Sequence, residues 1–175
     1  MILSSPLLAD TRLDLLRELN MPFIVHGRTT SAVPYPFLDI DNEGAFFKAT
    51  KLLTDLGHSR IGILNFDLNF NFANDRTNGY LHALSLAGLE RDCDLISEAT
   101  MNEQSGHDEA LRMFALPKPP TAFLCSSISQ ALGVRRAAKA KGLVIGKDVS
   151  LIAHDDRLHE IRAETFDPPL TATKS

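Results

Sequence analysis

The fold of this protein is decided between residues 41 and 65, which read DNEGAFFKATKLLTDLGHSRIGILN. Asp41 or Asn42 can cap a helix, and apolar residues then recur at spacings of three and four, the period of one helix face. They are Ala45, Ala49, Leu52, Leu53 and Leu56. Gly57 supplies a left-handed residue that ends the helix, and the apolar run 60–65 predicts a buried strand. A helix followed by a buried strand is the repeating unit of α/β proteins.

The same alternation of strand and helix extends over the rest of the chain. Short runs rich in β-branched and aromatic residues predict strands, and longer runs with a helical period predict the helices between them. The predicted strands are Ile2–Leu3, Pro22–His26, Phe37–Ile40, Arg60–Asn65, Leu95–Ala99, Thr121–Cys125 and Val149–Ala153, and the predicted helices cover residues 11–19, 41–56, 73–87, 105–116 and 127–141. We expect an α/β protein with a parallel sheet covered on both faces, and an extended exit segment over residues 166–175 with no element after it to pack on.

Length and composition are those of an ordinary globular protein. The chain has 175 residues, of which 44% are hydrophobic and 23% charged, enough for one domain or two small lobes. Eighteen Lys and Arg residues against 22 Asp and Glu residues give a formal charge of -4. The positive charge that drives non-specific binding to nucleic-acid phosphates is therefore missing, which argues against a free-standing DNA-binding module.

Cysteine usage and apolar runs bear on the cellular compartment. Cys93 and Cys125 are too few for a disulfide framework, which fits a reducing cytoplasm. The segment Met1–Pro6 lacks the pattern of a signal peptide, and no run reaches the ~18 apolar residues that cross a bilayer. A cytoplasmic protein without membrane contact is expected, and a matured periplasmic protein would show the same features.

Polar residues follow most of the predicted strands. In open parallel sheets, ligands bind beyond the carboxyl ends of the strands. The residues at those places are Ser4 and Ser5, His26 to Arg28, Asp41 and Asn42, Asn65 to Phe72, Ser126 and Ser127, and His154 to Asp156. Hydroxyls, amides, carboxylates, a guanidinium and aromatic rings together suit a neutral polyol such as a sugar. The alternative is that these are ordinary loop residues, which are polar because turns and caps need such side chains.

Metal and enzyme motifs give no comparable signal. The run His154–Asp156 with His159 and Glu160 has ligand-competent side chains, but its spacing is not that of a metal site, so no metal is expected. The chain has no nucleophile elbow, no phosphate-binding P-loop and no dinucleotide fingerprint. Cys125 ends a buried strand and is expected to be a small core residue. We therefore expect no catalytic residue, no cofactor and no enzyme activity.

Seven short motifs occur in the order and at the spacing of one known family. They are Phe37–Gly44 (FLDIDNEG), Leu56–Ile61 (LGHSRI), Arg76–Tyr80 (RTNGY), Pro119–Ala122 (PPTA), Ala131–Gly133 (ALG), Asp148–Asp156 (DVSLIAHDD) and Pro168–Thr171 (PPLT). Each motif is weak alone, but the ordered set is specific and spans nearly the whole chain. In these motifs the chain resembles the effector-binding core of the lactose and galactose repressor family (LacI/GalR) of bacterial transcription regulators.

The resemblance implies a fold and a division of the chain. It implies parallel-sheet, Rossmann-like lobes of the periplasmic-binding-protein-like type, with a small-molecule effector in the cleft between them. We expect this effector to be a sugar. Residues 1–40 would form a partial first lobe, residues 41–166 a largely complete second lobe, and residues 167–175 a segment that returns to the first lobe. The family's helix-turn-helix headpiece has no counterpart here. Operator DNA would thus be read only through a part outside this chain, and a homodimer is expected.

The resemblance also assigns residue roles. Arg76 matches the arginine that contacts effector hydroxyls, and Asp155 matches the aspartate that accepts hydrogen bonds from them. Ser127 stands where the family often has Asn, so its ligand contact would be shorter, and either Ser126 or Ser127 can cap the helix that follows. At the pocket floor His154 replaces the commoner aromatic residue.

Five further residues complete the predicted ligand contacts. They are Ser5, His26, Arg28, Phe70 and Phe72. Phe70 and Phe72 can stack on a sugar ring, or they can pack in the core. About forty residues rarely sustain their own core, so Leu13, Leu16, Phe23 and Val25 of the first lobe are expected to lack packing partners.

Three functions are compatible with these observations. The sequence favours the effector-binding and dimerisation core of a sugar-responsive repressor, in which the ligand changes the closure of the lobes. A sugar-binding protein of a transport system shares the architecture and remains an alternative. A small α/β enzyme using Asp155 or His154 as acid or base is a weaker alternative, because a fold alone implies no chemistry.

Overall fold

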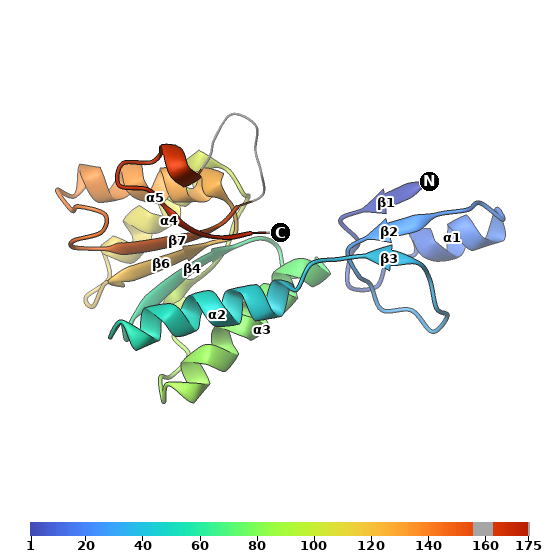
Figure 1. Cartoon of the computed structure of the whole chain (residues 1–175), viewed down its shortest axis with the longest axis horizontal. Coiled ribbons are helices and arrows are strands. Elements are labelled where there is room, and N and C mark those ends of the chain that lie inside the picture. The colour runs from blue at the N-terminus through green and yellow to red at the C-terminus, as the bar shows by residue number, and fades with distance from the viewer. Residues whose placement is uncertain (156–162, 175) are drawn as a thin grey trace.

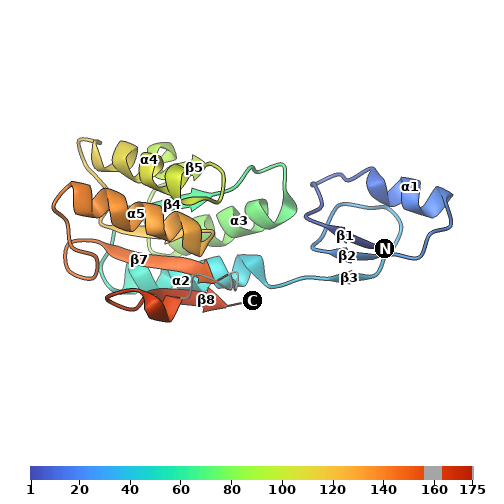
Figure 2. The same ribbon diagram turned by 90° about the horizontal axis from the view of Figure 1, so that it is seen from above.

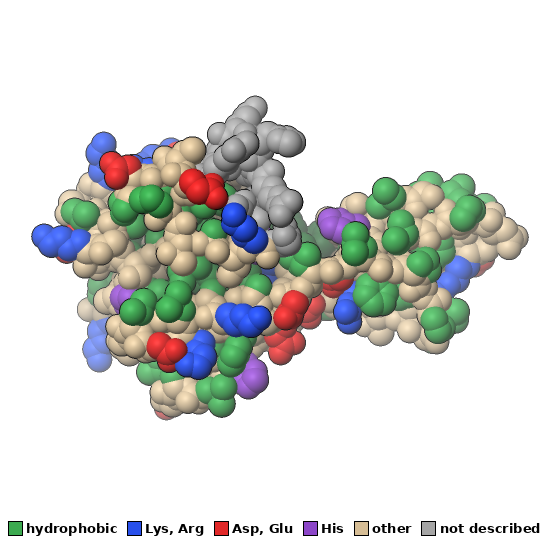
Figure 3. Space-filling model, viewed as in Figure 1, with side chains coloured by type: hydrophobic (Ala, Val, Ile, Leu, Met, Phe, Trp, Pro, Cys, Tyr) green, Lys and Arg blue, Asp and Glu red, His purple; other side chains and the backbone are tan. Residues whose placement is uncertain are grey.

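The computed structural model describes residues 1–155 and 163–174, without the side chain of Asp155. Figure 1 shows a small lobe built from the start of the chain and a larger lobe built from the rest. The described chain passes between the lobes once, over residues 39–41. Figure 3 shows this crossing as a narrow waist between two bulkier bodies.

The first lobe is a three-stranded parallel sheet with one helix. Its strands β1 (Ile2–Ser4), β2 (Ile24–His26) and β3 (Phe37–Leu38) lie in that order, and α1 (Arg12–Glu18) packs on the sheet, as Figure 2 shows. Leu3, Leu13, Leu16 and Val25 are buried between helix and sheet, and Phe23 packs against them. The expectation that these side chains lack partners is wrong, because a single helix is enough to cover one face of so small a sheet.

The opposite face of this sheet carries apolar side chains without a helix over them. Side chains alternate between the two faces along a strand, and paired residues on neighbouring strands point to the same face. Ile2 pairs with Ile24, and His26 pairs with Leu38. Ile2, Ile24 and Leu38 are 70%, 40% and 66% exposed. We call these three residues the open face of the first lobe.

The second lobe is a five-stranded, fully parallel sheet with helices on both faces, as the sequence predicts. The strand order is β5 (Ile96–Glu98), β4 (Ile61–Asn65), β6 (Ala122–Cys125), β7 (Ser150–Asp155) and β8 (Thr171–Lys174). Helices α2 (Asn42–Asp55) and α3 (Asn71–Leu86) cover one face, and α4 (Glu103–Phe114) and α5 (Ile128–Ala140) cover the other (Figures 1 and 2). Two short 3-10 helices, Cys93–Leu95 and Ala163–Thr165, complete the described chain.

Two features of the second lobe differ from the sequence-based expectation. Strand β8 pairs in parallel with β7, from Ile152 with Thr171 to Asp155 with Lys174, so residues 166–175 are not simply an exit segment. In α2 the buried face is formed by Asn42, Phe46, Ala49, Thr50 and Leu53, whereas Leu52 and Leu56 are exposed. Of the predicted apolar stripe, Ala49 and Leu53 are buried as expected, whereas Leu52 and Leu56 lie outside the face that meets the sheet.

The two lobes also meet at a second place, away from the crossing. Leu7 of the first lobe forms an isolated antiparallel bridge with Phe70 of the second. The backbone N–H of Leu8 donates a hydrogen bond of 2.8 Å to the carbonyl of Asn69. We call this contact the interlobe bridge.

Candidate functional site

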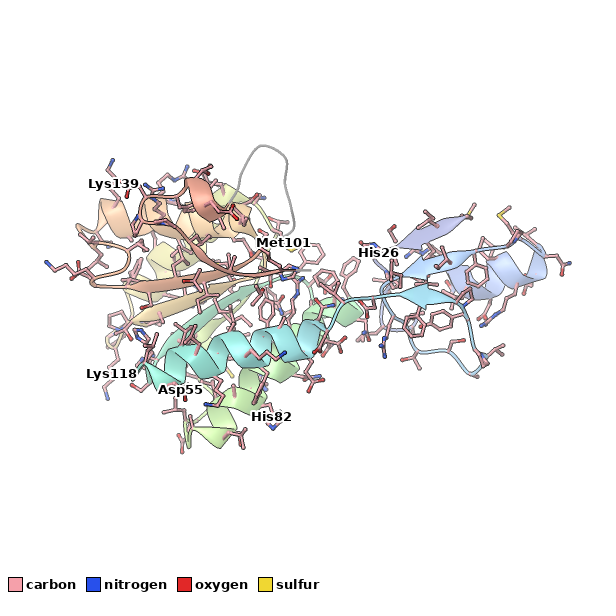
Figure 4. The ribbon with its side chains drawn as sticks, viewed as in Figure 1. His26, Asp55, His82, Met101, Lys118 and Lys139 are labelled. Carbon is pink, nitrogen blue, oxygen red and sulfur yellow. The ribbon has the colours of Figure 1, made fainter. Side chains whose placement is uncertain are left out.

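A cavity of about 370 Å³ lies between the lobes, at the carboxyl ends of their parallel strands. It is lined by Ser5, Pro6, His26, Gly27 and Arg28 of the first lobe, by Asp39, Ile40 and Asn42 of the crossing and the start of α2, and by Phe72, Arg76, Met101, Ser126 and His154 of the second lobe. Figure 4 shows His26 at the end of β2 and Met101 on the opposite lobe, facing each other across this region. Parallel α/β sheets bind ligands at this edge.

Arg76 is the most tightly held cation of the cavity wall. The side chain is buried, with the residue only 6% exposed, and its guanidinium lies 5.1 Å from the ring centre of Phe46 and 5.0 Å from that of Phe72. Its Nε donates to Asn42 Oδ1 at 2.8 Å, and its Nη1 donates to the carbonyl of Ser126 at 2.9 Å. These contacts fix the plane of the guanidinium, which is what recognition of paired hydroxyl or carboxylate oxygens requires.

A fully buried polar network stands behind Arg76. Ser126 Oγ donates to Asn65 Oδ1 at 2.7 Å, and the Ser126 N–H donates to Gln130 Oε1 at 3.1 Å. Asn65 Nδ2 donates to the carbonyl of Ala73 and to Thr77 Oγ1, which ties the end of β4 to α3. The carbonyl that holds Arg76 is thus fixed by the core of the second lobe.

The crossing supplies a second set of polar groups. Asp39 Oδ2 lies 3.5 Å from Arg28 Nε, and the guanidinium of Arg28 lies 4.6 Å from the ring centre of Phe37. The first-lobe wall therefore presents a cation paired with a carboxylate, and it adds little net charge to the cavity.

The loop at residues 5–10 brings Ser5 and Pro6 to the cavity. Asp10 is buried, and its carboxylate accepts from the N–H groups of Leu7 and Arg12 and from the guanidinium of Arg12. The hydrogen bonds from Arg12 hold the pKa of Asp10 below its usual value, although burial opposes this. Ser5 itself has a φ of 49°, a left-handed conformation that is uncommon for a residue other than glycine. This loop carries backbone strain next to the cavity, as functional sites often do.

His154 forms part of the cavity wall from β7. The residue is buried, and its Nδ1 forms a hydrogen bond of 3.0 Å with Thr173 Oγ1 of β8. Strand β8, which was not predicted from the sequence, therefore orients the side chain of His154 in the cavity wall. The side chain of Asp155 and residues 156–162, with Asp156, His159 and Glu160 among them, lie outside the described residues. The expected pairing of Arg76 with Asp155 stays a prediction.

Two of the predicted ligand contacts take other positions. Ser127 is not among the residues that line the cavity. Its hydroxyl accepts from the N–H of Gln130 at 3.1 Å and caps α5, while its neighbour Ser126 reaches the wall. Phe70 is also absent from that wall and packs on Phe66 and Phe72, with ring centres 5.0 and 6.0 Å away. Ser5, His26, Arg28, Phe72 and Arg76 do meet at one cavity.

Several wall residues were not singled out as ligand contacts from the sequence. The sequence places Asn42 among the polar residues after a strand and as a possible helix cap, and Asp39 within a strand. The FLDIDNEG motif was a signal that could have found both, because it marks the point where the chain leaves one sheet for the other. Met101 and Pro6 carry no sequence signal, since their place in the wall depends on how two loops fold back.

The chemistry of the cavity is that of binding. Guanidinium, imidazole, hydroxyl and amide groups surround the face of Phe72, an arrangement suited to a polar ring with an apolar side. Cys125 ends β6 fully buried, and burial raises the pKa of its thiol, which disfavours the nucleophilic thiolate. Among the described residues, no group of three or more His, Cys, Asp and Glu side chains is placed to hold a metal ion. Within the same residues no helix has the length and apolar character to span a membrane.

Comparison with known proteins finds one matching family model and several similar transcription regulators. The model of the periplasmic binding protein-like domain family matches residues 50–175. The HTH-type transcriptional regulator AglR of Rhizobium meliloti (strain 1021) is 44% identical over 167 residues, which are 95% of this chain and 47% of that protein. The chain thus spans about half the length of the curated relatives it matches. These relatives are transcription regulators and not enzymes.

Solved structures agree with this relationship. A regulatory protein of the LacI family from Chloroflexus aggregans superposes with a TM-score of 0.89 at 30% identity, over 98% of this chain and 60% of that one. The transcriptional regulator CelR in complex with cellobiose gives a TM-score of 0.87 at 28% identity, over 99% of this chain and 53% of that one. The family model, the regulator relatives and the lobed parallel-sheet fold lead to one conclusion: this chain belongs to the periplasmic-binding-protein-like family, as an effector-binding core of the LacI/GalR type.

Proposed function

We propose that this chain is the ligand-sensing core of a transcription repressor and that its effector is a neutral sugar. The observation that carries the proposal is Arg76, a guanidinium fixed in the wall of an interlobe cavity beside the ring of Phe72. A sugar offers adjacent hydroxyls to such a guanidinium and an apolar ring face to such an aromatic side chain. The cavity of about 370 Å³ is within the usual range for small-ligand sites.

The similar fold of the CelR–cellobiose complex supports this ligand class. In the proposed function, the sugar binds both lobes and favours one degree of closure, which changes how DNA is bound elsewhere in the full-length protein. Contact with operator DNA belongs to a part of that protein outside this chain. Homodimerisation and a cytoplasmic location belong to the same proposal.

Thermal denaturation with a sugar panel tests the ligand class. We expect glucose, maltose or cellobiose to raise the midpoint of unfolding, because a ligand that binds only the native state stabilises it by mass action. Glucose 6-phosphate and ribose 5-phosphate serve as anionic comparisons. Stabilisation by the phosphorylated sugars alone, or by none of the panel, would contradict the proposal.

A matched pair of variants tests the role of Arg76 in the proposed function. Arg76→Lys keeps the positive charge but removes the planar fork, so we expect it to weaken binding of the stabilising sugar at least tenfold. Arg112→Lys makes the same change on the exposed face of α4, where Arg112 pairs with Glu109, and we expect binding to be unchanged. Isothermal titration of both variants decides the matter. Equal affinities for the two variants would remove Arg76 from the site.

A further inference from the structure

The guanidinium of Arg76 connects the core of the second lobe to the residue at which the crossing enters helix α2. Its Nη1 is bound to Ser126 in the core of the second lobe, and its Nε is bound to Asn42 at the start of α2, next to the crossing. We propose that Asn42 is a positioning residue that couples the orientation of Arg76 to the crossing, so that a ligand held by Arg76 changes the angle between the lobes. This inference rests on the proposed function, because it concerns the same cavity.

The side chain of Asn42 is not the cap of helix α2. Helix α2 is capped by Asp41, whose Oδ1 accepts from the N–H of Gly44 at 2.8 Å. Asn42 is one residue further on, and it is 3% exposed. Burial of an amide is costly unless it is hydrogen-bonded, and the partner of the Asn42 oxygen is Arg76.

The hydrogen bonds of Asn42 differ in length on its two sides. The bond from Arg76 Nε to Asn42 Oδ1 is 2.8 Å, whereas Asn42 Nδ2 lies 3.5 Å from Asp39 Oδ1 and 3.4 Å from the carbonyl of Ile40. Hydrogen bonds of 3.4–3.5 Å are weak. The amide of Asn42 is therefore held firmly by Arg76 and more weakly by the crossing, and it links the two.

The weaker side of Asn42 continues into the first lobe. Asp39 is the residue that faces Arg28, whose charged group lies 3.5 Å from it. Both Arg28 and Arg76 line the cavity. A bound molecule that touches the two arginines would contact both ends of the series Arg76, Asn42, Asp39 and Arg28. Its contacts would then differ between lobe arrangements, and an allosteric ligand requires such a difference.

Two measurements without any ligand test the coupling. The first is the exchange with water of the Arg76 Nε proton, followed by ¹⁵N NMR. The second is the distance between spin labels at Glu18→Cys on α1 and Lys139→Cys on α5, measured by pulsed electron resonance in a Cys93→Ser background. Both label sites are exposed. They report the local hydrogen bond and the angle between the lobes separately.

We expect Asn42→Ala to speed exchange of the Arg76 Nε proton about tenfold, the effect of losing one buried hydrogen bond, and to broaden the label distances. Asn42→Asp keeps an acceptor for Arg76 Nε but loses the Nδ2 donor to Asp39 and Ile40, so it should restore slow exchange and leave the label distances broad. Asn78→Ala, at an exposed position of α3, should change neither.

Three results would overturn the proposal. They are unchanged label distances in Asn42→Ala, narrow label distances in Asn42→Asp, and the same broadening in Asn78→Ala. None of these measurements depends on a sugar. A failure of the sugar panel would therefore contradict the proposed function while leaving this test intact.

Discussion

Asp10 illustrates how one buried carboxylate shapes a loop at the cavity. It accepts from the backbone N–H groups of Leu7 and Arg12 and pairs with the Arg12 guanidinium. We predict that Asp10→Asn destabilises the chain by about 1–2 kcal/mol, because a charge-assisted set of hydrogen bonds is lost. Asp14→Asn is the control, since Asp14 is an exposed partner of Arg17 and should cost much less. Urea unfolding of both variants provides the comparison, and equal losses would refute the prediction.

The sign of the pH effect at Asp10 follows from its lowered pKa. The unfolded state binds a proton on this carboxylate more readily than the folded state does. Its stabilising contribution is therefore fully present above the ordinary Asp pKa and is lost as the pH falls through the folded value. Asp10→Asn should remove this part of the acid sensitivity.

His58 predicts a second pH dependence, near neutrality. Its ring bonds to Thr121 Oγ1 at 2.8 Å and to Ser150 Oγ at 2.9 Å, which joins the starts of β6 and β7. Burial lowers the pKa of His58, so protonation favours the unfolded state. The contribution is present above the unfolded value of about 6.5 and declines as the pH falls below it. Unfolding between pH 5 and 8 should show a flatter profile for His58→Gln, and an unaltered one for exposed His82→Gln.

At the scale of elements, helices α4 and α5 approach each other closely at Gly133. A Cβ at Gly133 would meet the carbonyl oxygen of Glu103 and the backbone nitrogen of His107. We predict that Gly133→Ala forces the two helices apart and costs about 1–3 kcal/mol. At Gly142, with a φ of 71° and open space around it, Gly142→Ala adds only the left-handed strain of about 1 kcal/mol. A lower midpoint of thermal unfolding for Gly142→Ala than for Gly133→Ala would contradict this prediction.

The elements show how far the sequence determines the fold. Strand β4 and helix α5 were predicted closely, because a buried parallel strand is a continuous apolar run and a helix ends where glycine follows. Strand β8 was not, since Thr171–Lys174 has little apolar character at the edge of the sheet. The face of α2 was misjudged because Phe46 and Thr50 are buried in place of Leu52 and Leu56, a choice made by the sheet it meets.

The site was predictable to a similar degree and for similar reasons. Strand ends give the neighbourhood of Ser5, His26 and Arg28, because parallel strands end at one edge. Whether Ser126 or Ser127 reaches the cavity depends on one peptide unit at the start of α5, which no local pattern fixes. The sequence places Asn42 after a predicted strand, but no local pattern gives its pairing with Arg76, 34 positions away.

At the scale of the whole molecule, the open face of the first lobe is an exposed apolar surface. Ile2, Ile24 and Leu38 form an exposed apolar surface on one side of the sheet, and such surfaces promote association. We predict that the 175-residue chain self-associates at micromolar concentration and that Ile24→Lys reduces this. Leu86→Lys changes an apolar residue that is 69% exposed on α3, away from that face, and should have little effect. Light scattering over a dilution series tells these outcomes apart. A monomer at all concentrations, or equal effects of both lysines, would refute the prediction.

The interlobe bridge limits the directions in which the lobes can move. A body attached at one point can turn about three axes, whereas a body attached at two points can turn only about the line through them. The crossing at residues 39–41 is one such point, and the Leu7–Phe70 contact with the Leu8–Asn69 hydrogen bond is the other. While both of these contacts hold, they favour opening and closing about the line that joins them. Once the Leu8–Asn69 hydrogen bond breaks, this restraint is lost and the first lobe can also twist about the crossing.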